Sequence, residues 1–153
     1  MLRNMDERDT ELVASKLKMN QTEAKKLIER WNSHLENGHF FEMLAVLDDD
    51  SVVGMISLYE HSKSIISIGP EIFEEYRRKG FGKVAMTEAI SRAKEKKYSI
   101  VLQQVRTNNS ASIGLHESLG FEKDNSIYKN RKGNDIFLYL KTICNMFQVL
   151  SKP

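Results

Sequence analysis

Apolar residues in the N-terminal part of the chain recur at the spacing of amphipathic helices. A short helix is predicted over residues 6–17, with apolar positions at Leu12, Val13 and Leu17. A second helix is signalled more clearly, because Asn20 and Glu23 form a capping-box pair ahead of a longer apolar stripe. That stripe consists of Ala24, Leu27, Ile28, Trp31 and Leu35. Asn37 and Gly38 suit a left-handed C-cap, so we predict that this helix ends there.

Runs of bulky apolar residues replace the helical spacing from residue 40 onward. Residues 40–47 and 52–59 are typical of an antiparallel hairpin, joined by the polar turn 48–51. A further strand is predicted over residues 64–73. Pro70 lies within it and cannot donate a ladder hydrogen bond, which indicates a bulge or an exposed edge at this point.

The C-terminal half alternates between helices and strands. We predict helices over residues 80–97 and 109–119, and strands over residues 99–105, 121–129 and 135–141. Because a long helix separates strands 64–73 and 99–105, these two strands should be parallel and joined by a right-handed crossover. Together with a short first strand at residues 2–4, this order predicts a mixed α/β (α+β) fold.

Length and composition restrict the class of protein. A chain of 153 residues with 41% hydrophobic and 29% charged residues is ordinary for one globular domain. The formal net charge of +2 argues against a nucleic-acid partner held by broad phosphate neutralisation. The N-terminus is too densely charged for a secretory signal, and no apolar run approaches the about 18 residues that a membrane span needs. We therefore expect a cytoplasmic protein with no membrane partner.

Metal binding and disulfides are not expected from this sequence. Cys144 is the only cysteine, so neither an intramolecular disulfide nor a cysteine-based metal cage can form. The histidines and carboxylates have no zinc-type spacing, and we predict no metal site.

The strongest chemical signal lies between a predicted strand and a predicted helix. There the chain reads Arg77, Arg78, Lys79, Gly80, Phe81, Gly82 and Lys83. The two glycines let the backbone come close to a ligand, because no Cβ stands in the way. The free N–H groups and the dipole at the start of the next helix favour an anion, and the cationic side chains add positive charge. This loop predicts a site for a pyrophosphate.

Two other phosphate-binding motifs fit the loop less well than this interpretation, and a turn without a ligand is a third alternative. Residues 80–85 match the loose dinucleotide fingerprint G-x-G-x-x-A, but Gln103 and Gln104 occupy the end of the next strand, where an acidic residue is expected. The phosphate loop of nucleoside triphosphatases needs a longer glycine spacing, with Ser or Thr after the lysine. A glycine turn with a solvated basic rim is the third.

A second motif follows the next predicted strand, and the two motifs together resemble the GNAT superfamily of N-acetyltransferases. The second motif runs from Asn109 to Phe121 and reads N-S-A-S-I-G-L-H-E-S-L-G-F. GNAT proteins join an Arg/Gln-x-x-Gly-x-Gly/Ala loop to a later Asn-x-x-Ala-x-x-Leu-Tyr-x-x-x-Gly-Phe segment. Here both occur in that order, about 30 residues apart. The resemblance covers residues 40–141 and is strong over residues 68–121.

The resemblance implies acetyl-CoA as co-substrate and a GNAT-like fold, in which two parallel strands splay apart to admit the pantetheine arm. Backbone groups of Ile72 and Phe73 would bond to that arm, and Asn109 would contact the cofactor from the second side. The pyrophosphate would be held by the loop that Arg77 begins, through Arg78, Lys79, Gly80, Phe81, Gly82 and Lys83. The implied partner is a small-molecule or peptide amine, and a homodimer is one arrangement that the family adopts.

Catalysis in this family is mostly placement, since the amine attacks the thioester directly. His116 occupies the position of the usual tyrosine of the second motif, and Ser112 that of the usual alanine. An imidazolium with a pKa of about 6.5 would protonate a departing thiolate, whose thiol has a pKa of about 8.5. The alternatives are a packed histidine with no proton role, or Tyr128 on the following strand as a weaker substitute for the acid. Glu71 is the nearest candidate base, and Glu60, His61 or ordered water are alternatives.

The resemblance therefore predicts a single acetyl-CoA-binding N-acetyltransferase domain over residues 1–153. It would comprise a helical substrate-side region (1–39), a core (40–141) and a tail (142–153). The predicted reaction is acetyl transfer to a primary amine in a ternary complex. A coenzyme-A-binding sensor or scaffold with weak chemistry is a second interpretation, because the middle of the strand before the loop lacks a carboxylate. A nucleotide-binding module is the third.

Overall fold

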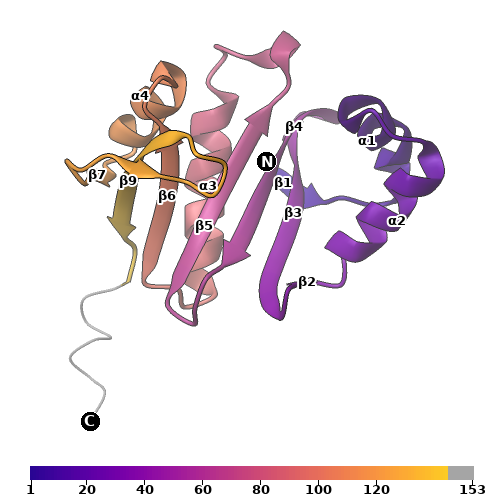
Figure 1. Ribbon diagram of the computed structural model, residues 1–153. Coiled ribbons are helices and arrows are strands. Elements are labelled where there is room, and N and C mark those ends of the chain that lie inside the picture. Colours follow the sequence, from indigo (N-terminus) through magenta and orange to yellow (C-terminus); the bar gives the residue numbers. More distant parts are fainter. Residues whose placement is uncertain (145–153) are drawn as a thin grey trace.

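The computed structural model describes residues 1–144, which form a mixed β-sheet with helices on both faces (Figure 1). The strands are β1 (Leu2–Asn4), β2 (Leu35–Glu36), β3 (His39–Asp48), β4 (Ser51–Glu60), β5 (Ile65–Ile72), β6 (Ile100–Arg106), β7 (Glu122–Lys123), β8 (Tyr128–Lys129) and β9 (Asp135–Thr142). The helices are α1 (Thr10–Leu17), α2 (Gln21–Trp31), α3 (Phe81–Glu95) and α4 (Ser110–Ser118), with short 3-10 turns η1 (Glu7–Asp9) and η2 (Glu74–Tyr76).

The sheet has the mixed topology that the sequence predicts. Across it the strands run in the order β1-β3-β4-β5-β6-β9-β7, with β2 paired to β3 and β8 paired to β9. β5 and β6 are parallel, and the other described pairs are antiparallel. The predicted α/β class, with a mostly antiparallel sheet and one parallel pair, is confirmed.

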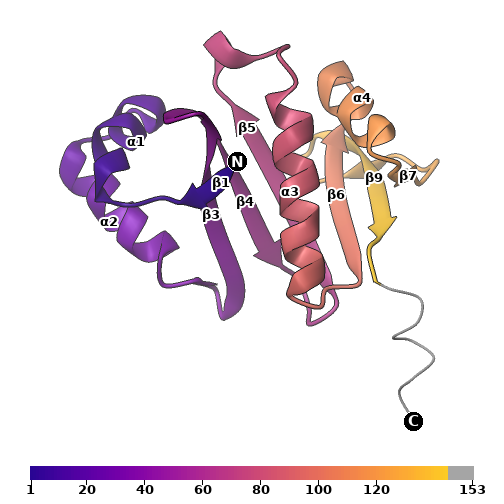
Figure 2. The same cartoon turned by 180° about the vertical axis from the view of Figure 1, so that it is seen from behind.

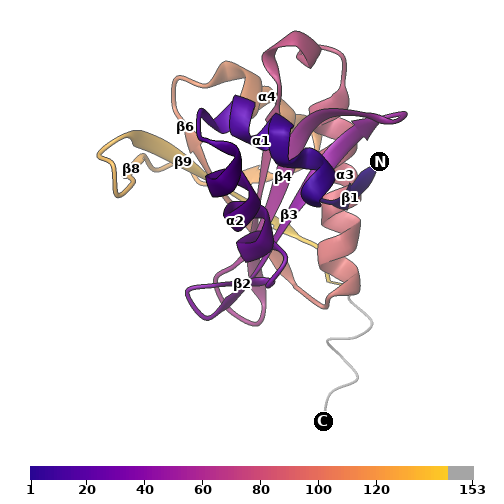
Figure 3. The ribbon, with the colours of Figure 1, turned by 90° about the vertical axis from the view of Figure 1, so that its right-hand side faces the viewer.

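Two hydrophobic cores lie on opposite faces of this sheet, because alternate residues of a strand point to opposite sides. Ile66 and Ile68 of β5 belong to the core that includes Met86 of α3. Met55 of β4 belongs to the other core, together with Trp31 of α2. Figure 2 shows α3 and α4 against the first face, and Figure 3 shows α1 and α2 beside β3 and β4. The two faces of the sheet are therefore covered by different helices, one by α3 and α4 and the other by α1 and α2.

The predicted start of α2 is confirmed, whereas its predicted end is wrong. The capping box is complete, since Glu23 N–H donates to Asn20 Oδ1 at 2.8 Å and Asn20 N–H donates to Glu23 Oε2 at 3.0 Å. The helix ends at Trp31 rather than at Asn37. Trp31 is buried, as its place on the apolar stripe predicts.

The segment after α2 forms a hairpin instead of a last helical turn. Leu35, which was predicted on the apolar stripe of the helix, lies in β2 and is 60% exposed. Asn37 and Gly38 have φ values of 52° and 78° and connect β2 to β3. An Asn-Gly pair suits a two-residue hairpin turn as well as a helix C-cap, because both need positive φ. The prediction that the helix reaches Asn37 is wrong for this reason.

Pro70 lies at an exposed strand edge and not in a bulge. The register between β4 and β5 runs without a shift from Glu60 opposite Ile66 to Gly54 opposite Ile72. On its other side β5 pairs with β6 only at its first two residues. Of the two alternatives that the proline indicated, the exposed edge is therefore confirmed.

The first of the two predicted C-terminal strands is not continuous, and the predicted tail is described only in part. Residues 121–129 do not form one strand, because β7 and β8 each pair with β9 over two residues and a turn separates them. Across that turn Tyr128 Oη of β8 donates to Asp124 Oδ2 at 2.6 Å. Of the tail, residues 145–153 lie outside the described residues. Among the helices of residues 1–144, none is long and apolar enough to cross a membrane.

Candidate functional site

The parallel strands β5 and β6 begin side by side and then diverge (Figure 1). Beyond their short ladder, two side-chain hydrogen bonds join them. Ser67 Oγ donates to the carbonyl of Leu102, and Gln103 Nε2 donates to the carbonyl of Ile68, each at 2.5 Å. These bonds form the apex of the split, which opens toward the first turns of α3 and α4.

The free edge of β5 faces this split. Phe73 N–H donates to the carbonyl of Val53 on β4 at 3.0 Å. Backbone groups in an antiparallel pair point alternately toward and away from the partner strand. The backbone groups of Ile68, Pro70 and Ile72 are therefore directed away from β4, into the split.

A groove of about 710 Å³ occupies the open end of the split. Its walls come from the end of β5, from the basic glycine loop, and from the first turns of α3 and α4. It contains all the predicted site residues except Phe73, Lys79 and His116. The two sequence motifs thus face each other across one groove.

The first turn of α3 supplies unoccupied backbone donors to the groove. Gly80 is the N-cap with a φ of 86°, and no side chain caps the helix there. The first N–H groups of an α-helix have no intrahelical partner, and the first turn here carries no acidic residue. At Gly82 a Cβ would lie 3.7 Å from Ile72 Cγ1, so its absence widens the groove. Uncapped amides and the helix dipole together suit an anion.

The cationic side chains of the loop have different surroundings. Arg77 Nε donates to the carbonyl of Ile72 at 2.9 Å and so bonds to the free edge of β5. Arg78 and Lys83 line the groove directly. Lys79 points elsewhere, with its ammonium 3.3 Å from the carbonyl of Glu75.

Phe73 is directed away from the groove. Its side chain is 4% exposed and belongs to the core under α1 and α2, with Lys16 Nζ 4.3 Å from its ring centroid. Its N–H is engaged by β4. Of the two residues predicted to bond the pantetheine arm, only Ile72 presents its backbone N–H to the split.

Asn109 and Ser112 form the opposite wall of the groove. Asn109 is the N-cap of α4, and its Oδ1 accepts a hydrogen bond from Ser112 N–H at 3.0 Å. This bond fixes the start of α4 beside the basic loop, and the side-chain amide of Asn109 keeps its donors.

His116 is a residue of α4 whose side chain is buried in the core and does not line the groove. It is 3% exposed, and its ring meets that of Phe121 edge-on at 5.0 Å. Its Nδ1 is 2.7 Å from the carbonyl of Ser112, so Nδ1 carries the proton. Among the described residues, Nε2 has no partner. Burial lowers the pKa of His116, opposed by the bond to Ser112, and this favours the neutral ring.

Glu71 lines the groove from the face that carries α1 and α2. It is exposed and lies opposite Met55, which belongs to the core on that face. A carboxylate at this place is accessible from the side opposite to α3.

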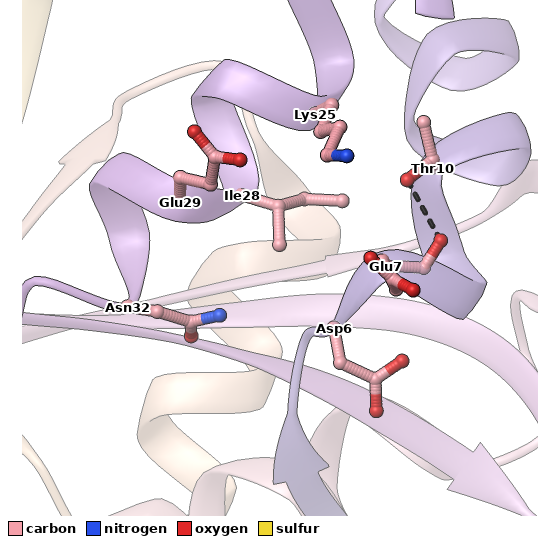
Figure 4. Close-up of a pocket in the computed structure, with 7 residues that line it drawn as sticks. All are labelled: Asp6, Glu7, Thr10, Lys25, Ile28, Glu29 and Asn32. Atoms are coloured by element: carbon pink, nitrogen blue, oxygen red, sulfur yellow. Dashed lines mark hydrogen bonds between the residues drawn. The ribbon is translucent and has the colours of Figure 1, made fainter.

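A second hollow, of about 210 Å³, lies between η1 and α2 (Figure 4). Its carboxylates come from Asp6, Glu7 and Glu29. Asp6 is bonded to Arg8, and this bond chiefly lowers the pKa of Asp6 to about 2. The hollow contains no residue of either sequence motif. Within residues 1–144, no group of three or more histidine, cysteine or acidic residues is arranged to hold a metal ion.

Several residues of the site were missed by sequence reasoning. Pro70, Tyr76 and Leu115 line the groove, and Ser67 and Gln103 close its apex. Ser67, Pro70 and Gln103 lie on strands that were predicted to be parallel, but the sequence pattern could not show which side chains line the groove or reach across the split.

Comparisons with known proteins agree with this geometry. The family model described as Acetyltransferase (GNAT) family matches residues 3–121. Over 92 residues, 58% of this chain, the sequence is 35% identical to the SPbeta prophage-derived uncharacterized N-acetyltransferase YokL of Bacillus subtilis (strain 168). That match covers 52% of YokL, so the chain spans about half the length of this relative.

Solved structures share the fold at low sequence identity. A chimera of spermidine N-acetyltransferase SpeG from Vibrio cholerae and hSSAT superposes with a TM-score of 0.76 at 17% identity, covering 99% of both chains. RimL, a ribosomal alpha-N-protein acetyltransferase in complex with coenzyme A, gives a TM-score of 0.78 at 15% identity, covering 92% of both chains. These structures share the fold, and the family model, which matches residues 3–121, shows that the chain belongs to the GNAT family of acetyltransferases.

Proposed function

We propose that this protein is an N-acetyltransferase that moves the acetyl group of acetyl-CoA to a primary amine by direct attack. The observation that carries this proposal is the groove at the open end of the split. There the uncapped amides of α3 meet the free edge of β5. The N–H groups of α3 by themselves would be enough to bind a nucleotide phosphate. The free edge of β5 beside them is needed only by a ligand with an extended arm that carries amide groups, as acetyl-CoA has.

The chain's own groups fit the parts of acetyl-CoA. The N–H groups at the start of α3, with Arg78 and Lys83, would hold the pyrophosphate. The N–H of Ile72 and the carbonyl of Pro70 face the split and would pair with the amides of the pantetheine arm, as an added strand does. Asn109 would contact the arm from α4.

The reaction needs correct placement and few further groups. The neutral amine forms a bond to the carbonyl carbon of the thioester, the C–S bond breaks, and the departing thiolate takes up a proton. The amine loses one proton to a base or to water. The products are an N-substituted acetamide and free coenzyme A.

The acceptor would approach from the face that carries α1 and α2, because α3 and α4 cover the other face (Figure 2). SpeG is named for spermidine and RimL for a ribosomal protein, so both a polyamine and a peptide N-terminus belong in a test panel. A cytoplasmic location, a homodimer and a single domain over residues 1–153 stay predictions.

Thermal-shift measurements with acetyl-CoA, ATP and NAD test the proposal. We expect stabilisation by acetyl-CoA, whereas stabilisation by ATP or NAD alone would exclude both an acetyltransferase and a coenzyme-A sensor. Release of free thiol across a panel of amines then separates these two. Binding of acetyl-CoA without turnover on any amine would favour the sensor.

We infer that Glu71 is the proton acceptor, because it lines the groove on the side from which the amine approaches. Glu71→Gln is expected to lower turnover by about 10- to 100-fold near neutral pH, with less loss at alkaline pH, where the amine is already neutral. Glu74→Gln in η2 is the matched control, since Glu74 does not line the groove. Equal rates for both variants would remove Glu71 from the mechanism.

His116 is the candidate acid, and the role requires its imidazolium form. If the role holds, His116→Phe slows turnover at least several-fold and leaves the affinity for acetyl-CoA nearly unchanged. An unaltered rate would assign His116 to the core alone. Burial lowers the pKa of His116 and so works against the charged form that this role requires.

The buried His116 also makes a prediction for stability against pH. Its pKa in the folded state lies below the unfolded value of about 6.5. Below that pH the unfolded chain therefore binds a proton that the folded chain does not, and the free energy of unfolding falls as pH falls. Urea unfolding of His116→Phe between pH 7 and pH 5 should show a shallower loss than the native chain. An identical pH dependence would contradict the neutral, buried ring.

A further inference from the structure

The carboxamide of Gln103 closes the apex of the split in a fixed orientation. Gln103 is 7% exposed, and its Nε2 lies 2.5 Å from the carbonyl oxygen of Ile68 on the opposite strand. A carbonyl oxygen only accepts hydrogen bonds, so the contacting atom must be the amide nitrogen. This bond uses one of the two N–H groups. Within residues 1–144, the structure shows no protein partner for the second.

The adjoining edge of β5 lacks a backbone donor. Of the backbone groups that face the split beyond Ile68, the next belong to Pro70, which has no N–H. The following donor on this edge is the N–H of Ile72, two residues farther from the apex. The polypeptide therefore leaves a gap in its row of donors next to the amide of Gln103.

Ser67, the second side chain at the apex, has no hydrogen left to donate to a ligand. Ser67 Oγ donates its only hydrogen to the carbonyl of Leu102 at 2.5 Å. His61 Nε2 lies 2.6 Å from the same Oγ and must therefore be the donor in that contact. Ser67 thus joins the strands without offering a hydrogen bond to a ligand, which leaves Gln103 as the available side-chain donor.

Acetyl transfer creates a need for such a donor. Attack of the amine moves the electron pair of the carbonyl onto its oxygen, and a preorganised N–H in a site that excludes water stabilises that charge. An arm entering from the pyrophosphate loop and running along the edge of β5 would bring its thioester to the apex. We propose that Gln103 is a catalytic residue that donates its second amide N–H to the thioester oxygen, where Pro70 supplies none.

In this step Gln103 transfers no proton. It holds the oxyanion while the C–N bond forms, and the negative charge leaves with the thiolate when the C–S bond breaks. The bond to Ile68 keeps the amide in place before the substrate arrives, so no reorganisation is needed during the reaction. The inference rests on the proposed function, and it adds the group that polarises the acyl carbon.

Infrared difference spectra of bound acetyl-CoA, labelled with ¹³C at the carbonyl carbon, test the proposal without an acceptor. A hydrogen bond lowers the stretching frequency of a carbonyl, so the band should lie lower in the native protein than in Gln103→Leu. Gln104→Leu is the matched control, because Gln104 is the neighbouring residue of β6 and its exposed side chain points to the other face. With an acceptor found in the panel, Gln103→Leu should lower kcat by about 100-fold with little change in KM for acetyl-CoA.

A second variant keeps the test valid if Gln103→Leu does not fold. Pro70→Ala adds an N–H to the open edge while Gln103 stays intact, and it should lower the carbonyl frequency further. An unchanged band in Gln103→Leu, or in Pro70→Ala where only that variant folds, would overturn the proposal. Calorimetry separates this failure from that of the proposed function. Acetyl-CoA that binds with an unperturbed carbonyl removes Gln103 alone, whereas no heat with acetyl-CoA removes the acetyltransferase itself.

Discussion

Gly82→Asp is expected to weaken the binding of acetyl-CoA by at least about 100-fold while leaving the fold intact. Gly82 lies in the first turn of α3 and faces the groove. A carboxylate there would point into the space for the pyrophosphate, and like charges about 4 Å apart repel by about 1–4 kcal/mol between water and a protein surface. A 100-fold loss corresponds to about 2.7 kcal/mol.

The same substitution should not destabilise the protein. An acidic residue in the first turn of a helix interacts favourably with the helix dipole, by about 0.3–1 kcal/mol. The measurements are calorimetric titration with acetyl-CoA and thermal unfolding without ligand. Val84→Asp is the matched control, since Val84 is 58% exposed on the same helix and does not line the groove. If both variants bound acetyl-CoA equally, the pyrophosphate would not sit at the start of α3.

Arg92→Ala is expected to destabilise the protein by about 3 kcal/mol. Arg92 of α3 makes two hydrogen bonds, of 2.9 and 2.8 Å, to the carboxylate of Glu42 on β3. The side chain of Glu42 is 4% exposed, so removing the arginine would leave a buried carboxylate without its partner. Breaking a buried pair costs about 3–5 kcal/mol, and we take the lower end because Arg92 is 35% exposed.

Urea unfolding of the single and double variants checks this expectation. Glu42→Met with Arg92→Met should recover most of the loss, because replacing both members of a buried pair with apolar residues is often neutral. Arg8→Ala is the control, since Arg8 makes similar short bonds to Asp6 at the surface. Exposed ion pairs contribute little, so a loss as small as that of Arg8→Ala would contradict the role of the buried pair.

The amino-acid sequence by itself determined the order of elements and the position of the binding loop. Apolar periodicity depends only on neighbouring residues, and it located α3, β6 and α4 with errors of a few residues at their ends. The glycine loop was identifiable because a strand, two glycines and a helix start are consecutive in the chain. The groove residues from Arg77 to Lys83 therefore followed from local sequence, apart from the outward direction of Lys79.

Local sequence was ambiguous wherever one residue pair suits two structures. Asn37 and Gly38 favour positive φ, which both a helix end and a hairpin turn require. The pairing of β2 with β3 decided between them, and that pairing joins residues on either side of the turn. Residues 121–129 were predicted as one strand, but their pairing with β9 breaks off between Lys123 and Tyr128.

Only the tertiary structure decided which side chains meet. The Glu42–Arg92 pair and the Gln103–Ile68 bond join residues separated by 50 and 35 positions in the chain. His116 shares a motif with Asn109, yet one packs in the core and the other lines the groove, since Asn109 is the N-cap at the start of α4 and His116 lies in its last turn, against Phe121. Periodicity assigns a residue to a face of its own element. What that face contacts depends on how the elements pack, because the contacts join segments that the local pattern does not relate.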